Sequence, residues 1–118
     1  MTPFGRRLRD LRRERGIALK DMAKALDVSS AYLSALEHGH RGRPTRSMVH
    51  RICAYFNIIW DEAEELQELA RLSHPRVVVD TAGLSPAATE LANRLAERIG
   101  KLDEAAIKRL LAAMDGKE

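Results

Sequence analysis

Apolar residues in this chain recur every three or four positions through most of its length, which is the spacing of amphipathic helices. Glycines, prolines and short polar residues interrupt the pattern where helices commonly begin and end. Three consecutive valines are the exception, since a β-branched run of this kind is typical of a strand. We therefore predict helices over residues 3–15, 19–26, 30–38, 45–56, 60–72, 86–99 and 104–114, and a short strand formed by Val77, Val78 and Val79.

Capping residues mark several of the predicted helix ends. Gly16 follows the first helix, and a glycine there readily adopts the left-handed conformation that ends a helix. Ser29 precedes the third helix, where its hydroxyl can accept a hydrogen bond from a free amide and contribute about 1 kcal/mol. Ser85 and Asp103 stand at the same position before the last two helices. These signals separate a short second helix from a short third helix by a tight turn.

The predicted elements fall into two groups along the chain. Residues 1–74 contain five helices whose apolar stripes can share one core, and we expect a compact all-α domain there. Residues 75–118 form an extension with one short β-strand and two helices. Hydrophobic residues make up 45% of the chain and aromatic residues only 4%, so the core must consist largely of aliphatic side chains.

The net charge of +3 conceals an uneven distribution of charge along the chain. Residues 1–56 contain 12 Lys and Arg against 5 Asp and Glu, a net charge of +7. Residues 57–75 contain 1 against 5, and residues 76–118 contain 7 against 7. A basic segment followed by a neutral appendage is the pattern expected of a nucleic-acid-binding module.

The second and third predicted helices form the motif that bears on function. Met22, Ala23 and Leu26 lie at spacings that let the second helix pack on Leu33 and Leu36 of the third. Two short helices joined by a tight turn have the form of a helix-turn-helix, whose second helix enters the major groove of double-stranded DNA.

Over residues 4–56 the sequence resembles the Cro and phage-repressor helix-turn-helix family, also called the XRE type. The resemblance implies a five-helix repressor-like DNA-binding domain over residues 1–74 and a recognition helix at residues 30–38. It also implies a homodimer that regulates transcription, as a repressor, from operator DNA. The resemblance is carried by Ala23, Leu26, Val28, Ser29, Tyr32, Leu33, Leu36, Glu37 and Gly39.

The same resemblance assigns the DNA-contacting positions. It places the outward face of the recognition helix in the groove, Tyr32 against a phosphate and Glu37 in a structural role. Basic residues on neighbouring elements are further candidates for phosphate contacts. The expected DNA-binding residues are Ser29, Ser30, Ala31, Tyr32, Ser34, Ala35, His38, His40, Arg41, Arg43, Arg46, Lys20 and Arg15.

Two departures from the family bear on how DNA would be read. Many relatives begin the second helix with Thr and Gln, a cap and a phosphate contact, whereas this chain has Ala18 and Leu19. The recognition helix also lacks the Arg, Asn and Gln side chains that make paired hydrogen bonds to bases. We therefore expect phosphate attraction to supply much of the affinity, with strong salt dependence. Among the arginines of the first helix, Arg6 and Arg15 are the better phosphate candidates, and most of the others are expected to be solvated.

The loop sequence Arg41-Gly42-Arg43-Pro44 leaves three interpretations open. It resembles the core of an AT-hook, in which arginines enter a narrow A·T-rich minor groove with a strongly negative potential. The same arginines could instead contact phosphates. The third interpretation is a solvated linker with no role in binding.

Residues 84–114 carry a long apolar stripe that two short helices cannot bury alone. The predicted strand also needs a partner, because an unpaired strand leaves its backbone groups unsatisfied. A homodimer would cover the helices, with or without strand pairing across a two-fold axis. The expected dimerisation residues are Val77, Val78, Val79, Leu91, Leu95, Ile99 and Leu110.

Other classes of function find no support in the sequence. The single cysteine, Cys53, cannot form an internal disulfide, which suits a cytoplasmic protein, and we expect a buried thiol there. The four histidines lack the spacing and the additional ligands of a structural zinc site. No motif of a catalytic or phosphate-binding loop is present. We expect no enzyme activity, no cofactor, no metal, no secretion signal and no membrane association.

Two further functions remain open alongside a transcriptional regulator. One is an antitoxin, whose C-terminal helices neutralise a protein partner while the complex represses its own promoter. The other is an interaction protein whose helix-turn-helix no longer reads DNA, which Ala18, Leu19 and the plain recognition helix would explain.

Overall fold

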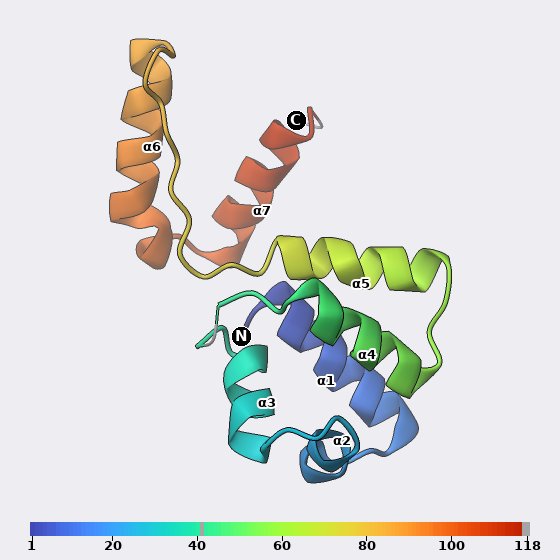
Figure 1. Ribbon diagram of the computed structural model, residues 1–118. Coiled ribbons are helices and arrows are strands. Elements are labelled where there is room, and N and C mark those ends of the chain that lie inside the picture. Colours follow the sequence, from blue (N-terminus) through green and yellow to red (C-terminus); the bar gives the residue numbers. More distant parts are fainter. Residues whose placement is uncertain (41, 117–118) are drawn as a thin grey trace. The chain divides into compact units, whose positions relative to one another are not determined.

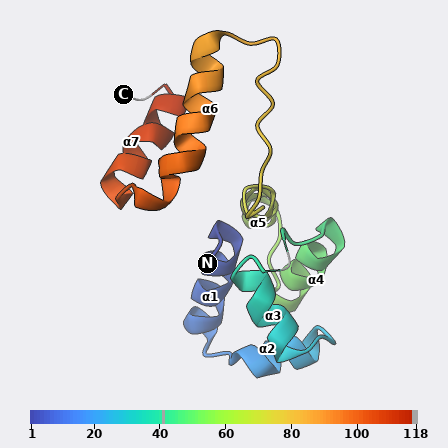
Figure 2. The ribbon, with the colours of Figure 1, turned by 90° about the vertical axis from the view of Figure 1, so that its left-hand side faces the viewer.

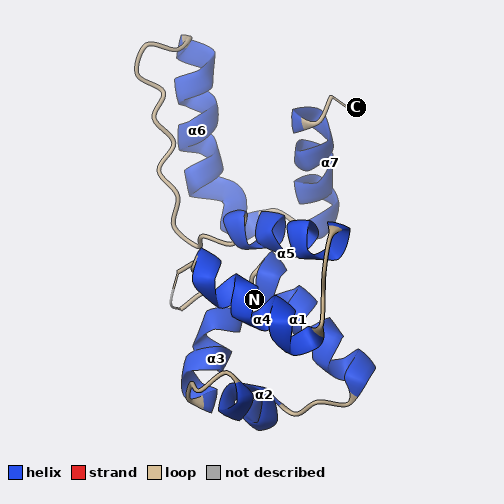
Figure 3. Cartoon of the chain, turned by 45° about the vertical axis from the view of Figure 1, so that its right-hand side comes forward, coloured by secondary structure: helices blue, strands red, loops and turns tan. Residues whose placement is uncertain are grey.

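The computed structural model describes residues 1–40 and 42–116. Over these residues the regular secondary structure is entirely helical (Figure 3). The chain divides into two compact units, Met1–Val77 and Val78–Glu118. The helices are α1 (Pro3–Arg15), α2 (Leu19–Ala25), α3 (Ser30–Glu37), α4 (Arg46–Phe56), α5 (Asp61–Arg71), α6 (Pro86–Arg98) and α7 (Glu104–Met114), with a 3₁₀ turn at Ile99–Lys101 between the last two.

The first unit is a five-helix domain built around one aliphatic core. α1 packs on α3 and α5, α2 packs on α3, and α4 packs on α5 (Figure 1). The predicted apolar stripes all face this core, which confirms the helical periodicity of the sequence. The side chains with no exposed surface are Phe4, Leu8, Met22, Leu33, Val49, Ile52 and Phe56.

Capping groups bound these helices, two of them at Gly16 and Ser29 as the sequence predicts. The Ser29 hydroxyl accepts a hydrogen bond from the Tyr32 amide at 3.0 Å, so the predicted cap of α3 is confirmed. Thr2 and Thr45 cap α1 and α4 in the same way. Gly16 and Asn57 adopt the left-handed conformation after α1 and α4. Local chemistry thereby fixes both ends of α1 and α4 and the start of α3, whereas α2 begins without a side-chain cap.

Gly5 permits the close approach of α1 to the end of α3. A Cβ atom added at Gly5 would lie 1.9 Å from the carbonyl oxygen of Glu37. The same carbonyl accepts a hydrogen bond from the Thr2 amide at 3.1 Å. At the other side of α1, the Phe4 amide donates to the Ser73 hydroxyl at 2.9 Å, which ties the start of α1 to the end of α5. α1 is therefore held to both neighbours at its first turn.

The second unit has two helices and no buried side chain among its described residues. Ser85 and Asp103 cap α6 and α7, as predicted. α6 ends at Arg98, one residue before the predicted end at residue 99, and continues into the 3₁₀ turn that contains Gly100. α6 packs on this turn, and the two helices leave most of their apolar side chains exposed.

The predicted strand at Val77, Val78 and Val79 is wrong for this chain. These residues form an irregular segment, and their side chains are 73%, 96% and 64% exposed. β-branched residues favour strands largely through packing against neighbouring strands. The part of the chain that the structure describes offers no second strand, so the valines have no partner there (Figure 2).

Candidate nucleic-acid interface

α2 and α3 form a helix-turn-helix held together by the residues that the sequence singled out. Met22, Ala23 and Leu26 are buried, as are Leu33 and Leu36. The turn between the helices contains Asp27, which has a positive φ of 58°. Because the inner faces are packed, the outer face of α3 is presented away from the core.

The first turn of α3 presents small side chains to solvent. Ser29, Ser30 and Ala31 are exposed, while Ser34 and Ala35 one turn later are half-buried. Tyr32 is half-buried and packs against the core cluster rather than standing free of the domain. A helix with short exposed side chains can approach the base edges of a groove closely, and serine hydroxyls and alanine methyls can contact bases there.

An ion pair between half-buried Arg12 and buried Glu37 joins α1 to α3. One guanidinium nitrogen of Arg12 lies 2.9 Å from each carboxylate oxygen of Glu37. The side chains are 11% and 1% exposed. The structural role implied for Glu37 therefore has a physical basis, since two charges at this depth are tolerated only when they satisfy each other.

The six arginines of α1 divide into three classes by their contacts. Arg6 pairs with Asp10 and Arg7 with Glu14, at 3.9 Å and 3.8 Å. Arg12 pairs with Glu37 as described. Arg9 and Arg13 form no hydrogen bond or ion pair with any described residue. Arg15 forms a hydrogen bond to a backbone carbonyl.

Arg15 has an internal partner that the sequence did not indicate. Its guanidinium donates to the carbonyl of Phe56, the last residue of α4, and lies 5.4 Å from the centre of the Phe56 ring. A cation at the negative end of a helix is favourable. The sequence favoured Arg6 and Arg15, near the two ends of α1, as phosphate contacts. In the structure Arg6 pairs with Asp10, and Arg15 caps α4. Arg9 and Arg13 instead have no ionic partner among the described residues.

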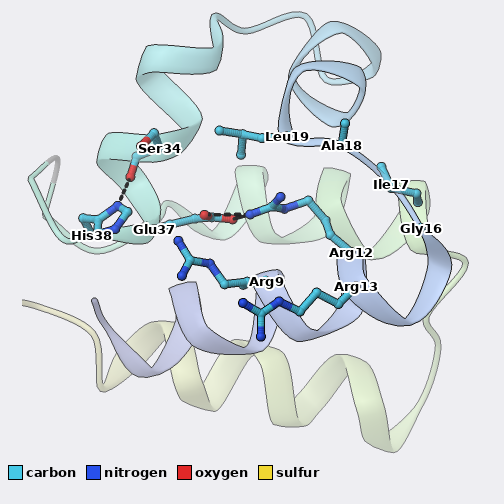
Figure 4. A pocket seen from close by; sticks show the side chains of 10 residues that line it. All are labelled: Arg9, Arg12, Arg13, Gly16, Ile17, Ala18, Leu19, Ser34, Glu37 and His38. Atoms are coloured by element: carbon cyan, nitrogen blue, oxygen red, sulfur yellow. Dashed lines mark hydrogen bonds and ion pairs between the residues drawn. The ribbon is translucent and has the colours of Figure 1, made fainter.

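Arg9, Arg12 and Arg13 line an open hollow beside α3 (Figure 4). The hollow measures about 560 Å³, and Ser34 and His38 lie on its α3 side. Figure 4 shows the guanidinium groups of Arg9 and Arg13 on the side of the hollow that α1 provides. The hollow therefore combines unpaired positive charge with the exposed side of the helix-turn-helix, an arrangement suited to an anionic group.

The end of α3 carries two exposed histidines. Nδ1 of His38 donates to the carbonyl of Ser34 at 2.8 Å, which orients the ring along the helix. The His38 and His40 rings have their centres 6.2 Å apart. His38 and His40, both predicted to contact DNA, thus lie close together just after the last residue of α3.

The loop after α3 is only partly covered by the structure. Arg41 lies outside the described residues. Gly42 has a φ of 74°, Arg43 is exposed and Pro44 is buried. Of the other predicted phosphate contacts, Lys20 and Arg46 are both exposed. The three interpretations of this loop all remain predictions.

The predicted dimerisation residues lie on exposed surfaces of the second unit and the segment before it. Leu91, Ile99 and Leu110 are 59%, 53% and 40% exposed, and Leu95 is half-buried. They share the apolar faces of α6, the 3₁₀ turn and α7. A dimer remains a prediction at this point.

Cys53 and the histidines show no sign of a redox or metal centre in the part of the chain that the structure describes. The Cys53 side chain is buried in α4, and burial raises the pKa of its thiol. Within residues 1–40 and 42–116, no three His, Cys, Asp or Glu side chains are grouped to hold a metal ion. Over the same residues, every helix is too short or too polar to cross a bilayer.

Comparison with known proteins identifies the N-terminal half of the chain. Residues 3–66 match the model of a family described as helix-turn-helix domain. An uncharacterized HTH-type transcriptional regulator of Bacillus subtilis, RghRB, is 34% identical over 61 residues, which is 52% of this chain and 44% of that protein. The HTH-type transcriptional regulator DdrOP3 of Deinococcus deserti is 44% identical over 52 residues, 44% of this chain and 40% of that protein. The chain thus spans less than half the length of these relatives. No solved structure matches it significantly.

Proposed function

Since the chain belongs to this helix-turn-helix domain family, we propose that it binds double-stranded DNA with α3 and thereby regulates transcription. The observation that carries the proposal is the exposed first turn of α3, whose small side chains stand on a rigid two-helix frame beside unpaired arginines. The names of the two similar proteins, both transcriptional regulators, support the same conclusion.

The proposed contacts divide into base-facing and phosphate-facing groups. Ser30, Ala31 and Ser34 would approach base edges, where a thymine methyl or a single hydrogen bond suits their chemistry. Arg9 and Arg13 are added to the phosphate contacts expected from the sequence, because they line the hollow beside α3 and form no ion pair with any described residue. Arg15 is instead assigned to holding the end of α4. The proposed phosphate-facing group is Arg9, Arg13, Lys20, Tyr32, His40, Arg41, Arg43 and Arg46.

We further propose that the regulator is a homodimer and acts as a repressor. α6 and α7 expose large apolar side chains on a unit, Val78–Glu118, that holds 6 Lys and Arg against 7 Asp and Glu, a net charge of −1, so self-association would meet little overall repulsion. Two-fold dimers match palindromic half-sites about one helical turn of DNA apart. A bound repressor would act by occupying a promoter.

A second candidate function, an antitoxin, rests on the same exposed helices. If α6 and α7 cover a protein of different sequence, the DNA-binding unit would repress the promoter of that pair. The two candidates differ in what covers α6 and α7, and both require DNA binding by α3. A stoichiometric complex with the product of an adjacent gene would favour the second.

Selection from a random duplex library at near-physiological salt tests the proposed function. We expect enrichment of a palindrome whose half-sites lie about one helical turn apart. An A·T-rich element beside it would favour minor-groove insertion of the loop arginines. Binding without any enrichment, at every salt concentration that permits binding, would contradict a sequence-specific regulator.

A further inference from the structure

A hollow at the end of α3 brings together residues from two distant parts of the first unit. It measures about 620 Å³, and its described lining comes from the loop after α3 and from the residues after α5. These two parts are in close contact, since a Cβ atom added at Gly39 would lie 3.6 Å from Cβ of Pro75. The described lining contains no carboxylate, and its charged or titratable side chains are all exposed: His38, His40, His74 and Arg76.

Hydrogen bonds to the backbone fix the proton positions of two of these histidines in their neutral state. Nδ1 of His38 lies 2.8 Å from the Ser34 carbonyl oxygen, which can only accept, so Nδ1 carries the proton. A neutral His38 therefore leaves Nε2 as an acceptor, which cannot donate to an anion. His74 is the reverse, because its Nδ1 accepts from the Arg76 amide at 3.2 Å and the proton of the neutral ring is then on Nε2. His74 can donate to an anion while neutral, whereas His38 must first be protonated.

The charged groups that face His38 come from several elements, because this residue also lines the hollow between α1 and α3. Glu37 is the single carboxylate among the described residues of the two linings, and Arg12 contacts both of its oxygens. The other groups that face His38 are basic: Arg9, Arg13, His40, His74 and Arg76. A protonated His38 thus has no free carboxylate beside it in the described part of the chain, and an anion from outside would compensate its charge.

The position of this hollow favours the phosphates of DNA over an isolated anion. His38 belongs to both hollows, so they form one continuous basic surface that runs from α1, past the end of α3, to Arg76. A row of donors of this kind suits a polyanion with regularly spaced phosphates. The surface adjoins α3, the helix proposed to enter the major groove.

We propose that the hollow at the end of α3 holds one phosphate of the DNA backbone and that His38 takes up a proton from solvent when it does so. The proton binds Nε2 of His38, which then donates to a phosphate oxygen while Nδ1 keeps its bond to Ser34. His74 and Arg76 donate to the same phosphate. This contact rests on the proposed function, because the phosphate belongs to DNA bound by α3. Since histidine changes its charge between about pH 5 and pH 8, DNA affinity rises as the pH falls through this range.

Variants at exposed positions separate the proton from the permanent charge. His38→Gln removes the titrating group, whereas His38→Lys keeps a positive charge throughout the range and suits the C-terminal end of α3. Arg76→Gln removes the permanent charge of the hollow and leaves His38 in place. His50→Gln is the matched control, because His50 is an exposed histidine of α4 that lines neither hollow.

Fluorescence anisotropy of each full-length chain with a labelled duplex, at constant ionic strength and several pH values, tests the proposal. We expect the wild-type chain to bind about tenfold more tightly at about pH 6 than at about pH 8, as uptake of one proton requires. His38→Gln should bind weakly and His38→Lys tightly, both with a flat pH profile. Arg76→Gln should bind about threefold more weakly at every pH with the wild-type profile, and His50→Gln should behave as wild type.

A flat profile of the wild-type chain would overturn the proposal and leave DNA binding, and so the proposed function, in place. If millimolar inorganic phosphate then raised the Tm of the DNA-free wild-type chain but not that of His38→Gln, the hollow would hold a free anion instead. An unchanged profile in His38→Gln would also overturn the proposal, because the proton would then be taken up elsewhere. Failure of every chain to bind DNA at any pH would contradict the proposed function itself.

Discussion

Arg12 of α1 and Glu37 of α3 form an ion pair in which one guanidinium nitrogen lies 2.9 Å from both carboxylate oxygens. The pair joins the last residue of α3 to the helix that carries the two unpaired arginines. It therefore fixes the geometry of the proposed DNA-contacting surface as well as the core beneath it. The Nε atom of Arg12 is buried without a hydrogen-bond partner among the described residues. The Glu37 carboxylate is therefore the main group that compensates the desolvation of the Arg12 guanidinium.

Removing one member of this pair should destabilise the domain. We expect Glu37→Ala to lower the free energy of unfolding by about 3 kcal/mol, the lower end for a broken buried pair, because the part-buried guanidinium of Arg12 then loses its counter-charge. Urea unfolding monitored by circular dichroism measures the change. The control is Glu14→Ala, which breaks the exposed Arg7–Glu14 pair and should cost less than about 1 kcal/mol. Equal effects of the two variants would contradict a structural role for the buried pair.

The contacts of the α1 arginines predict which of them bind DNA. We expect Arg9→Gln and Arg13→Gln each to weaken binding of operator and random duplex alike, and to reduce the slope of log K against log salt by about 1. Fluorescence anisotropy with a labelled duplex at several salt concentrations gives both quantities. Arg6→Gln and Arg7→Gln are the matched controls from the same helix, since both side chains already have acidic partners. The assignment is wrong if all four variants change the slope equally.

The close contact between α1 and α3 predicts that alanine at Gly5 lowers the stability of the first unit, whereas alanine at Gly100 does not. Gly5→Ala would force a Cβ against the Glu37 carbonyl, and we expect a loss of about 3 kcal/mol or more in the free energy of unfolding. Gly100→Ala meets nothing within 4 Å and should leave unfolding of the first unit unchanged. Thermal unfolding of the two variants measures the difference. A well-folded Gly5→Ala protein of unaltered stability would show that α1 and α3 can separate without cost.

Burial of Cys53 predicts how its thiol reacts with pH. Because burial raises the pKa of the thiol, less thiolate is present in the folded chain than for a free cysteine at the same pH. We expect slow alkylation at mildly alkaline pH and rapid alkylation after unfolding. Because the pKa of Cys53 is raised on folding, the protonated thiol contributes to the free energy of unfolding at neutral pH. This contribution is lost as the pH rises through the raised pKa. Iodoacetamide labelling followed by mass spectrometry, with and without urea, checks this prediction. Rapid labelling of the folded chain would contradict it.

The parts of the fold that the sequence predicted well are those fixed by local chemistry. Ser29 and Gly16 define helix ends through hydrogen bonds and backbone conformation close in sequence, and both behave as predicted. The valines at 77–79 were wrongly predicted as a strand, because a strand depends on a partner distant in sequence or on another chain. The family also followed from the sequence, since the buried residues of α2 and α3 carry its pattern.

The details of the candidate interface were less predictable, because they depend on which charges meet in space. Arg15 and Arg9 are both arginines of one helix, yet one contacts Phe56 and the other has no ionic partner among the described residues. Nothing in the spacing along α1 distinguishes them. The exposure of Trp60 could not be predicted from the sequence either, because a large apolar residue at a helix start ordinarily packs inward.

The second unit has no buried side chain among its described residues, and this limits how long its helices stay folded. Two short helices without a core cannot offset the conformational entropy that folding costs them. If a second copy covers α6 and α7, as proposed, their order would be set by mass action, through the concentration of the chain. The unit would fray and become open to proteases when that cover is scarce, so the survival of residues 78–116 would report how much of the covering surface is present.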